Sequence, residues 1–236
     1  MPILERASRL RLTRPLVLVD QPLSPKVRPP LPDKSGFAMS IVGPAGSGKT
    51  STMISIVKSR DGYKKRYESI IVVIPASSLD SLKSNPFRDL ENSYQSLDYE
   101  SLDKIIATVE QSREENEKTL LIMDDVSSQL HDSVILKRLM RLFLNRRHLL
   151  LSIIVLSHSL TGHGALPFTL RKNVSHLIVF RPSAALAVLN QEYLHLPNKQ
   201  FAELVDYVYT GKHDHLMVVT ATGELYKNFN RLTQSV

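Results

Sequence analysis

Residues 43–50 read Gly-Pro-Ala-Gly-Ser-Gly-Lys-Thr, which is the pattern G-x-x-x-x-G-K-[ST]. An apolar run at residues 37–42 precedes the pattern and predicts a short buried strand, and an amphipathic helix is predicted to start near Lys49. A bound triphosphate needs backbone N–H groups that turn inward, and glycine reaches the required backbone angles without a Cβ penalty. The helix directs its positive N-terminal end at the same phosphates. This strand–loop–helix unit therefore predicts a phosphate-binding loop.

The loop residues divide into backbone contacts and two side chains with chemical roles. Lys49 is expected to reach the β- and γ-phosphates and to act in catalysis, and the Thr50 hydroxyl is expected to ligate Mg²⁺. ATP with Mg²⁺ is the predicted ligand pair. We predict nucleotide contacts from Gly43, Pro44, Ala45, Gly46, Ser47, Gly48, Lys49, Thr50 and Ser51.

A second chemical feature lies at residues 119–125, Thr-Leu-Leu-Ile-Met-Asp-Asp, an apolar strand that ends in two carboxylates. Asp124 is placed to hold Mg²⁺ through water, and Asp125 is placed to orient and deprotonate the attacking water. In isolation such a pair is more often a set of acidic turn residues. The phosphate-binding loop earlier in the chain favours the catalytic interpretation.

The next apolar strand, residues 149–156, is flanked by two further candidates. His158 follows the strand and is predicted to sense the γ-phosphate, with an ordinary surface histidine as the alternative. Arg146 and Arg147 precede the strand. Phosphoryl transfer needs a cation for the transition-state charge, so one of them is a candidate catalytic arginine that acts on a neighbouring subunit. The alternative is a solvated or DNA-facing pair.

The order of elements predicts an α/β fold with a mainly parallel sheet covered by helices on both faces. Ligands in such sheets bind at the carboxyl ends of the strands. Residues 215–220 and 224–229 predict a closing C-terminal β-hairpin. We divide the chain into a proline-rich extended arm, residues 1–35, with a short strand at 16–19, and an ATPase domain, residues 36–236. A disordered tail is the alternative for the arm.

Composition sets wider limits. The formal net charge of +7 suits a polyanionic partner, and the absence of cysteine excludes disulfides and agrees with an intracellular protein. No apolar stretch is long enough to span a bilayer, so no membrane partner is expected. Residues 63–67, Tyr-Lys-Lys-Arg-Tyr, suggest either a DNA contact or a solvated basic face. His213-Asp214-His215 offers metal ligands, but no third ligand is evident.

Taken in order, GPAGSGKT, LLIMDD, NRRHLLLSIIVLSHS and LPFTLRKN followed by HLIVFRPS resemble the FtsK–HerA superfamily of P-loop ATPases. More narrowly they resemble the genome-packaging ATPases of poxvirus-like, giant-virus and virophage lineages. The matching positions of that narrower pattern are Arg147-His148, the strand to Ser157, and Arg171-Lys172-Asn173. Two positions depart from the family pattern, because the family sensor is typically Gln where His158 stands, and Glu is common where Asp125 stands.

The resemblance implies a RecA-like fold and a homo-oligomeric ring, a pentamer or hexamer, that hydrolyses ATP to pump double-stranded DNA into a preformed capsid. Its implied partners are the DNA, the other subunits and the capsid vertex proteins. Its implied location is the host cytoplasm or viral factory, with association with the virion also compatible. Three alternatives stay open: a cellular or plasmid DNA translocase or helicase of the same superfamily, a nucleotide-gated scaffold with weak hydrolysis, and, least favoured, a small-molecule kinase.

Overall fold

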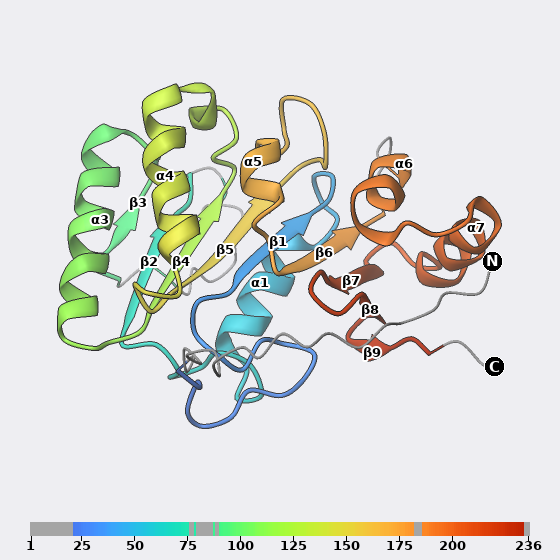
Figure 1. Ribbon diagram of the computed structural model, residues 1–236, viewed down its shortest axis with the longest axis horizontal. Coiled ribbons are helices and arrows are strands. Elements are labelled where there is room, and N and C mark those ends of the chain that lie inside the picture. The colour runs from blue at the N-terminus through green and yellow to red at the C-terminus, as the bar shows by residue number, and fades with distance from the viewer. Residues whose placement is uncertain (1–20, 76–77, 79–86, 88–89, 182–185, 234–236) are drawn as a thin grey trace, which may run out of the picture.

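The computed structural model describes residues 21–75, 78, 87, 90–181 and 186–233. Within these residues one sheet has the strand order β3-β2-β4-β5-β1-β6-β7-β8-β9 (Figure 1). The strands from β3 to β6 in this order are parallel, and β7, β8 and β9 continue the sheet antiparallel. The strands are β1 Ala38–Val42, β2 Ser69–Val73, β3 Ser93–Tyr94, β4 Thr119–Asp124, β5 Leu151–Ser157, β6 His176–Phe180, β7 His215–Val219, β8 Glu224–Lys227 and β9 Asn230–Arg231.

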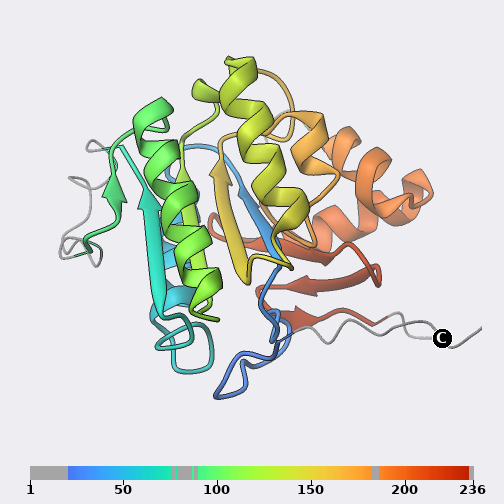
Figure 2. The same ribbon diagram turned by 60° about the vertical axis from the view of Figure 1, so that its left-hand side comes forward.

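Helices cover both faces of this sheet. The helices α3, α4 and α5 lie in front of the sheet in Figure 2, and α1 lies behind it. The predicted fold class is thereby confirmed, and the C-terminal hairpin is β7–β8, extended by β9. The helices are α1 Lys49–Lys58, α3 Tyr99–Glu114, α4 Ser133–Asn145, α5 Phe168–Arg171, α6 Leu186–Leu189 and α7 Asn198–Val208, with a 3₁₀ turn at Gln129–His131 and a π-helical turn at Asn190–Leu194.

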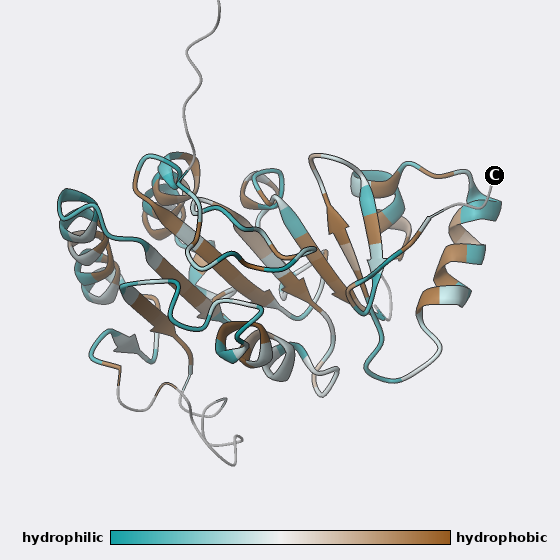
Figure 3. Cartoon of the chain, turned by 90° about the horizontal axis from the view of Figure 1, so that it is seen from below, coloured by the Kyte–Doolittle hydropathy of each residue, from teal (hydrophilic) through white to brown (hydrophobic). Residues whose placement is uncertain are grey.

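The core forms because strand side chains alternate between the two faces. In β1, Met39 and Ile41 pack on the α1 side, whereas Ala38 packs on the side of α3 and α4. Every residue of β4 and β5 is buried, as expected for parallel strands covered on both faces. The central strands are accordingly predominantly hydrophobic in Figure 3. This rigid centre carries the carboxyl ends of β1, β4 and β5.

Tyr63, Arg66 and Tyr67 are part of the core, which corrects the sequence-based interpretations of residues 63–67 for these three side chains. Tyr63 is only 1% exposed and stacks on Phe37 at 5.2 Å, and Tyr67 meets Tyr63 edge-on at 5.8 Å. Arg66 is also buried and donates to two backbone carbonyl oxygens, those of Lys64 and Arg60. Burying the tyrosine rings is more favourable than leaving the whole segment in water, so only Lys64 and Lys65 face solvent.

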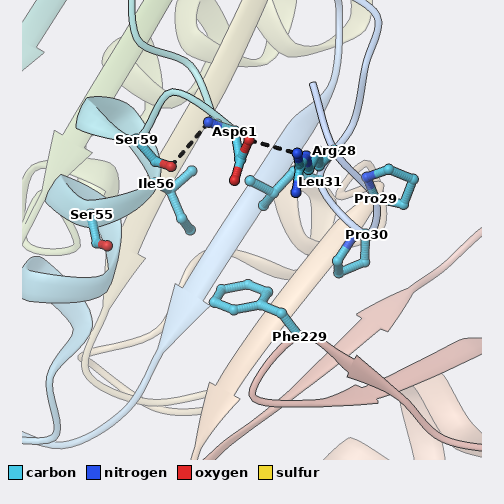
Figure 4. A pocket seen from close by; sticks show the side chains of 10 residues that line it. Arg28, Pro29, Pro30, Leu31, Ser55, Ile56, Ser59, Asp61 and Phe229 are labelled. Carbon is cyan, nitrogen blue, oxygen red and sulfur yellow. Dashed lines mark hydrogen bonds and ion pairs between the residues drawn. The ribbon is translucent and has the colours of Figure 1, made fainter. Parts of the chain in front are cut away.

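The N-terminal segment from residue 21 packs along the same face as α1. Leu23 and Val27 are buried in the core beside α1, and Arg28 forms an ion pair with Asp61 at 3.1 Å. The segment, the end of α1 with the turn after it, and Phe229 line an open hollow of about 290 Å³ (Figure 4). The predicted strand at residues 16–19 lies outside the described residues. The division between an arm and an ATPase domain at residue 36 stays a prediction.

The burial of His176, at the start of β6, can be tested through the pH dependence of stability. Burial lowers the pKa of His176 from 6.5 to about 4. Between these two pH values the unfolded chain binds a proton that the folded chain does not, so the free energy of unfolding rises with pH across this window. The shifted pKa of His176 changes the free energy of unfolding by on the order of 2–3 kcal/mol across this window. We expect His176→Gln to flatten the pH dependence of the urea midpoint between pH 4 and 6.5. If the urea midpoints of wild type and His176→Gln depend on pH in the same way, His176 does not have a lowered pKa.

Candidate nucleotide-binding site

The predicted phosphate-binding loop connects the carboxyl end of β1 to the N-terminus of α1. Gly48 caps α1 with a φ of 110°, which favours glycine over any residue with a Cβ. Gly43 is needed for a different reason from the one that the sequence suggested. A Cβ at Gly43 would stand 2.7 Å from Cβ of Phe180 and 2.8 Å from Oγ of Ser47. Close packing against β6, not a positive φ, therefore excludes a side chain at Gly43.

Lys49 lies folded back over the loop. Its Nζ donates to the carbonyl oxygens of Gly43 at 2.7 Å and Pro44 at 3.0 Å. The side chain is buried, and this burial lowers the pKa of Lys49 against the opposing influence of Asp124 and Asp125. The buried Lys49 ammonium group is held by neutral carbonyl oxygens. An anionic ligand would stabilise its positive charge better.

Asp124 and Thr50 meet across the site. Asp124 is the last residue of β4 and is 5% exposed, and Thr50 Oγ1 donates to Asp124 Oδ2 at 3.2 Å. Burial raises the pKa of Asp124, whereas the hydrogen bond from Thr50 and the charge of Lys49 act in the opposite direction. A hydroxyl and a carboxylate oxygen are hard donors of the kind that Mg²⁺ prefers. These two residues therefore fit the predicted metal site.

The other predicted carboxylate, Asp125, adopts a left-handed backbone with a φ of 54°. Aspartate tolerates this region better than most residues, and such outliers gather at functional sites. The Asp125 side chain is 45% exposed, and its Oδ1 lies 3.4 Å from Nε2 of His158. His158 follows β5, whose end lies between those of β1 and β4 because Val42 aligns with Ser157 and Asp124 aligns with Leu156. The structure thus places the predicted sensor beside the predicted base.

The remaining loop positions frame the same edge of the sheet. Ala45 and Gly46 are exposed at the crest of the loop, and Ser51 is exposed in the first turn of α1. Pro44 is partly buried, and Ser47 is buried, with an Oγ that has no hydrogen-bond partner. The predicted contact positions thus form one continuous stretch of chain at the N-terminal end of α1, in which exposed and buried residues are interspersed.

Arg146 and Arg147 lie at the other end of the parallel strands, near their amino ends. They follow α4 and precede β5, a seven-residue strand that spans roughly 20 Å. Arg146 Nη1 donates to the carbonyl oxygen of Phe143 at 2.6 Å, whereas Arg147 is exposed and passes close to Gly36. An arginine side chain cannot cover the length of β5, so the structure does not bring either residue to the nucleotide edge of its own subunit.

One neighbour of the loop was missed by sequence reasoning. His213 precedes β7, and its Nδ1 lies 2.9 Å from the carbonyl oxygen of Ser47. The two residues are 166 positions apart, and no local pattern connects them. The metal site considered for residues 213–215 has no support, because Asp214 is engaged by Thr210, Gly211 and Asn228. Among the described residues no three potential ligands cluster to hold a metal.

Together the fold and the site define a RecA-like P-loop ATPase. The family model described as poxvirus A32 protein matches residues 31–222, and the chain belongs to that family. This match confirms the predicted resemblance to genome-packaging ATPases within the FtsK–HerA superfamily. No curated protein sequence matches the chain significantly. No helix in the described part of the chain is long and apolar enough to cross a membrane.

Solved structures show the same fold at low identity. The genome packaging NTPase B204 from Sulfolobus turreted icosahedral virus 2, in complex with ATP-gammaS, is similar over 81% of this chain and 96% of its own, with 14% identity and a TM-score of 0.56. B204, the DNA-packaging ATPase from Sulfolobus turreted icosahedral virus, is similar over 82% and 97%, with 13% identity and a TM-score of 0.55. The pCW3 conjugation coupling protein TcpA, in a monomer form with ATPgS, is similar over 84% and 60%, with 12% identity and a TM-score of 0.55.

Proposed function

We propose that this ATPase is a motor that packages a double-stranded DNA genome into a preformed viral capsid. The observation that carries the proposal is the match of residues 31–222 to the poxvirus A32 family. The net charge of +7 suits a polyanionic substrate. The role places the protein where genomes and capsids meet, in the host cytoplasm or viral factory, with the capsid vertex as its docking partner.

In this proposal the residues of the site have different roles during hydrolysis. Lys49 and the loop N–H groups would bind the phosphates, and Thr50 and Asp124 would hold Mg²⁺, which would neutralise charge on the phosphates. Asp125 accepts a proton from the attacking water, and His158, 3.4 Å from Asp125, sets the position of that carboxylate relative to the γ-phosphate. Each of these residues lies at or near the carboxyl edge of the sheet, so ATP is bound across the ends of β1, β5 and β4.

The catalytic arginine in this proposal comes from the adjacent subunit of a five- or six-membered ring. Arg147 is exposed at the far edge of the sheet, about a strand length from its own phosphate loop. A head-to-tail contact between subunits would bring this edge to the nucleotide edge of a neighbour. Such an arrangement makes hydrolysis in one subunit depend on its neighbour.

The experiment that tests the motor is ATP hydrolysis by the purified protein with and without double-stranded DNA. We expect DNA to raise kcat at least about tenfold, because a motor couples its chemical step to its load. Particle mass should rise to that of a ring when ATP and DNA are both present. A low rate that DNA does not change, from a protein that stays a monomer, would instead support a nucleotide-gated scaffold.

A further inference from the structure

We propose that His213 is a positioning residue for the phosphate-binding loop. His213 fixes the direction of one inward N–H group of the loop and thereby sets the affinity for ATP. The inference rests on nucleotide binding by the loop and is independent of DNA. Among the described residues His213 reaches the loop from the far end of the chain, with Nδ1 2.9 Å from the carbonyl oxygen of Ser47. A carbonyl oxygen only accepts, so Nδ1 carries the proton and donates it.

This contact determines where the next N–H points. In a trans peptide the C=O and the N–H lie on opposite sides, so a donor that holds the Ser47 oxygen directs the Gly48 N–H away from His213, into the loop. In the described part of the chain no hydrogen bond uses that N–H. Donation to the oxygen also polarises the peptide and strengthens its N–H as a donor. Gly48, with a φ of 110°, has many accessible backbone states, so an external restraint is effective here.

His213 is itself held by a hydrogen-bonded turn. Asp214 accepts hydrogen bonds from Asn228 Nδ2 at 2.6 Å, the Gly211 N–H at 2.5 Å and Thr210 Oγ1 at 2.9 Å, and these bonds lower the pKa of Asp214 to about 2. The next residue, His215, is buried, with its ring 5.1 Å from Phe180 and 4.8 Å from Phe229. Phe180 in turn packs against Gly43 and Gly48. The start of β7 therefore contacts the loop directly through His213 and indirectly through His215 and Phe180.

The side from which His213 approaches predicts which kinetic constant it controls. Asp124 and the residues around His158 lie at the ends of β4 and β5, on one side of β1. His213 precedes β7, on the other side of β1. The γ-phosphate reacts beside the carboxylates, so His213 acts on the part of the loop that is farther from the bond that breaks. Its removal should therefore weaken binding more than it slows the chemical step.

The test compares His213→Ala, His213→Asn and His213→Gln in direct binding of a fluorescent ATP analogue and in steady-state hydrolysis. Asparagine carries its N–H₂ on Cγ, as histidine carries Nδ1, whereas glutamine places it one atom further out. We expect His213→Ala and His213→Gln to raise Kd and KM about three- to tenfold, with a smaller change in kcat. His213→Asn should recover most of the affinity. Melting temperatures report whether each variant folds.

Unchanged affinity in folded His213→Ala would overturn the inference, as would equal losses of affinity in the asparagine and glutamine variants. A loss of kcat alone would also contradict it, because that result would place His213 in the chemical step. If the wild-type protein binds no nucleotide, the proposed function fails as well. Normal wild-type binding with an insensitive His213 removes only the present inference.

Discussion

Replacement of Asp125 by asparagine should lower kcat for ATP hydrolysis at least about 100-fold while ATP binding stays within about twofold of wild type. The carboxylate is the predicted base, and the amide cannot accept the proton from water. Asparagine also tolerates the left-handed backbone that Asp125 adopts at a φ of 54°. The substitution therefore removes the chemistry without imposing strain. Phosphate release and analogue binding, measured on the same preparation, separate the two effects.

A matched comparison is Asp125→Ala, which removes the same carboxylate but fits the left-handed region poorly. This variant should lose both activity and some thermal stability, whereas Asp125→Asn should keep the wild-type melting temperature. If Asp125→Asn retains most of its turnover, the base lies elsewhere. His158, whose Nε2 lies 3.4 Å from Asp125 Oδ1, would then become the first alternative.

Arg147→Ala should lower kcat about 10³-fold or more, because a catalytic arginine contributes on that scale to phosphoryl transfer. The effect should also be dominant when mutant and wild-type subunits are mixed. Arg147 lies at the amino ends of the parallel strands, opposite to its own nucleotide site, so in the proposed ring each mutant subunit would disable the site of its neighbour. Activity, measured against the fraction of mutant protein, should fall more steeply than the fraction of wild-type subunits.

Arg141→Ala is the matched control, since Arg141 is an exposed arginine on the preceding helix α4. It should leave the basal rate near that of wild type. A strictly proportional loss in the Arg147→Ala mixtures would argue against action between subunits. Arg146→Ala is expected to act differently, through stability, because Arg146 is partly buried and is bonded to the carbonyl oxygen of Phe143.

The parallel sheet and the loop were predictable because their signals are local. A glycine-rich loop between a strand and a helix, and apolar strands such as β4 and β5, show their structure in a few consecutive residues. The burial of Tyr63 and Tyr67 was not predictable in this way, because basic neighbours concealed two core side chains whose partners lie far along the chain. The same holds for Gly43, whose need for glycine depends on Phe180. Tertiary contacts, rather than sequence periodicity, decided both cases.

In the part of the chain that the structure describes, the two outermost strands of the sheet, β3 and β9, have only two residues each. An edge this short offers few free backbone groups, which protects a chain from joining its neighbours by continuous strand pairing. Copies of this protein would therefore associate through side chains on helices and loops, whose contacts can slide and reform. If the protein forms the proposed ring, its subunits would then be able to change their relative angle during a hydrolytic cycle without breaking hydrogen bonds between strands.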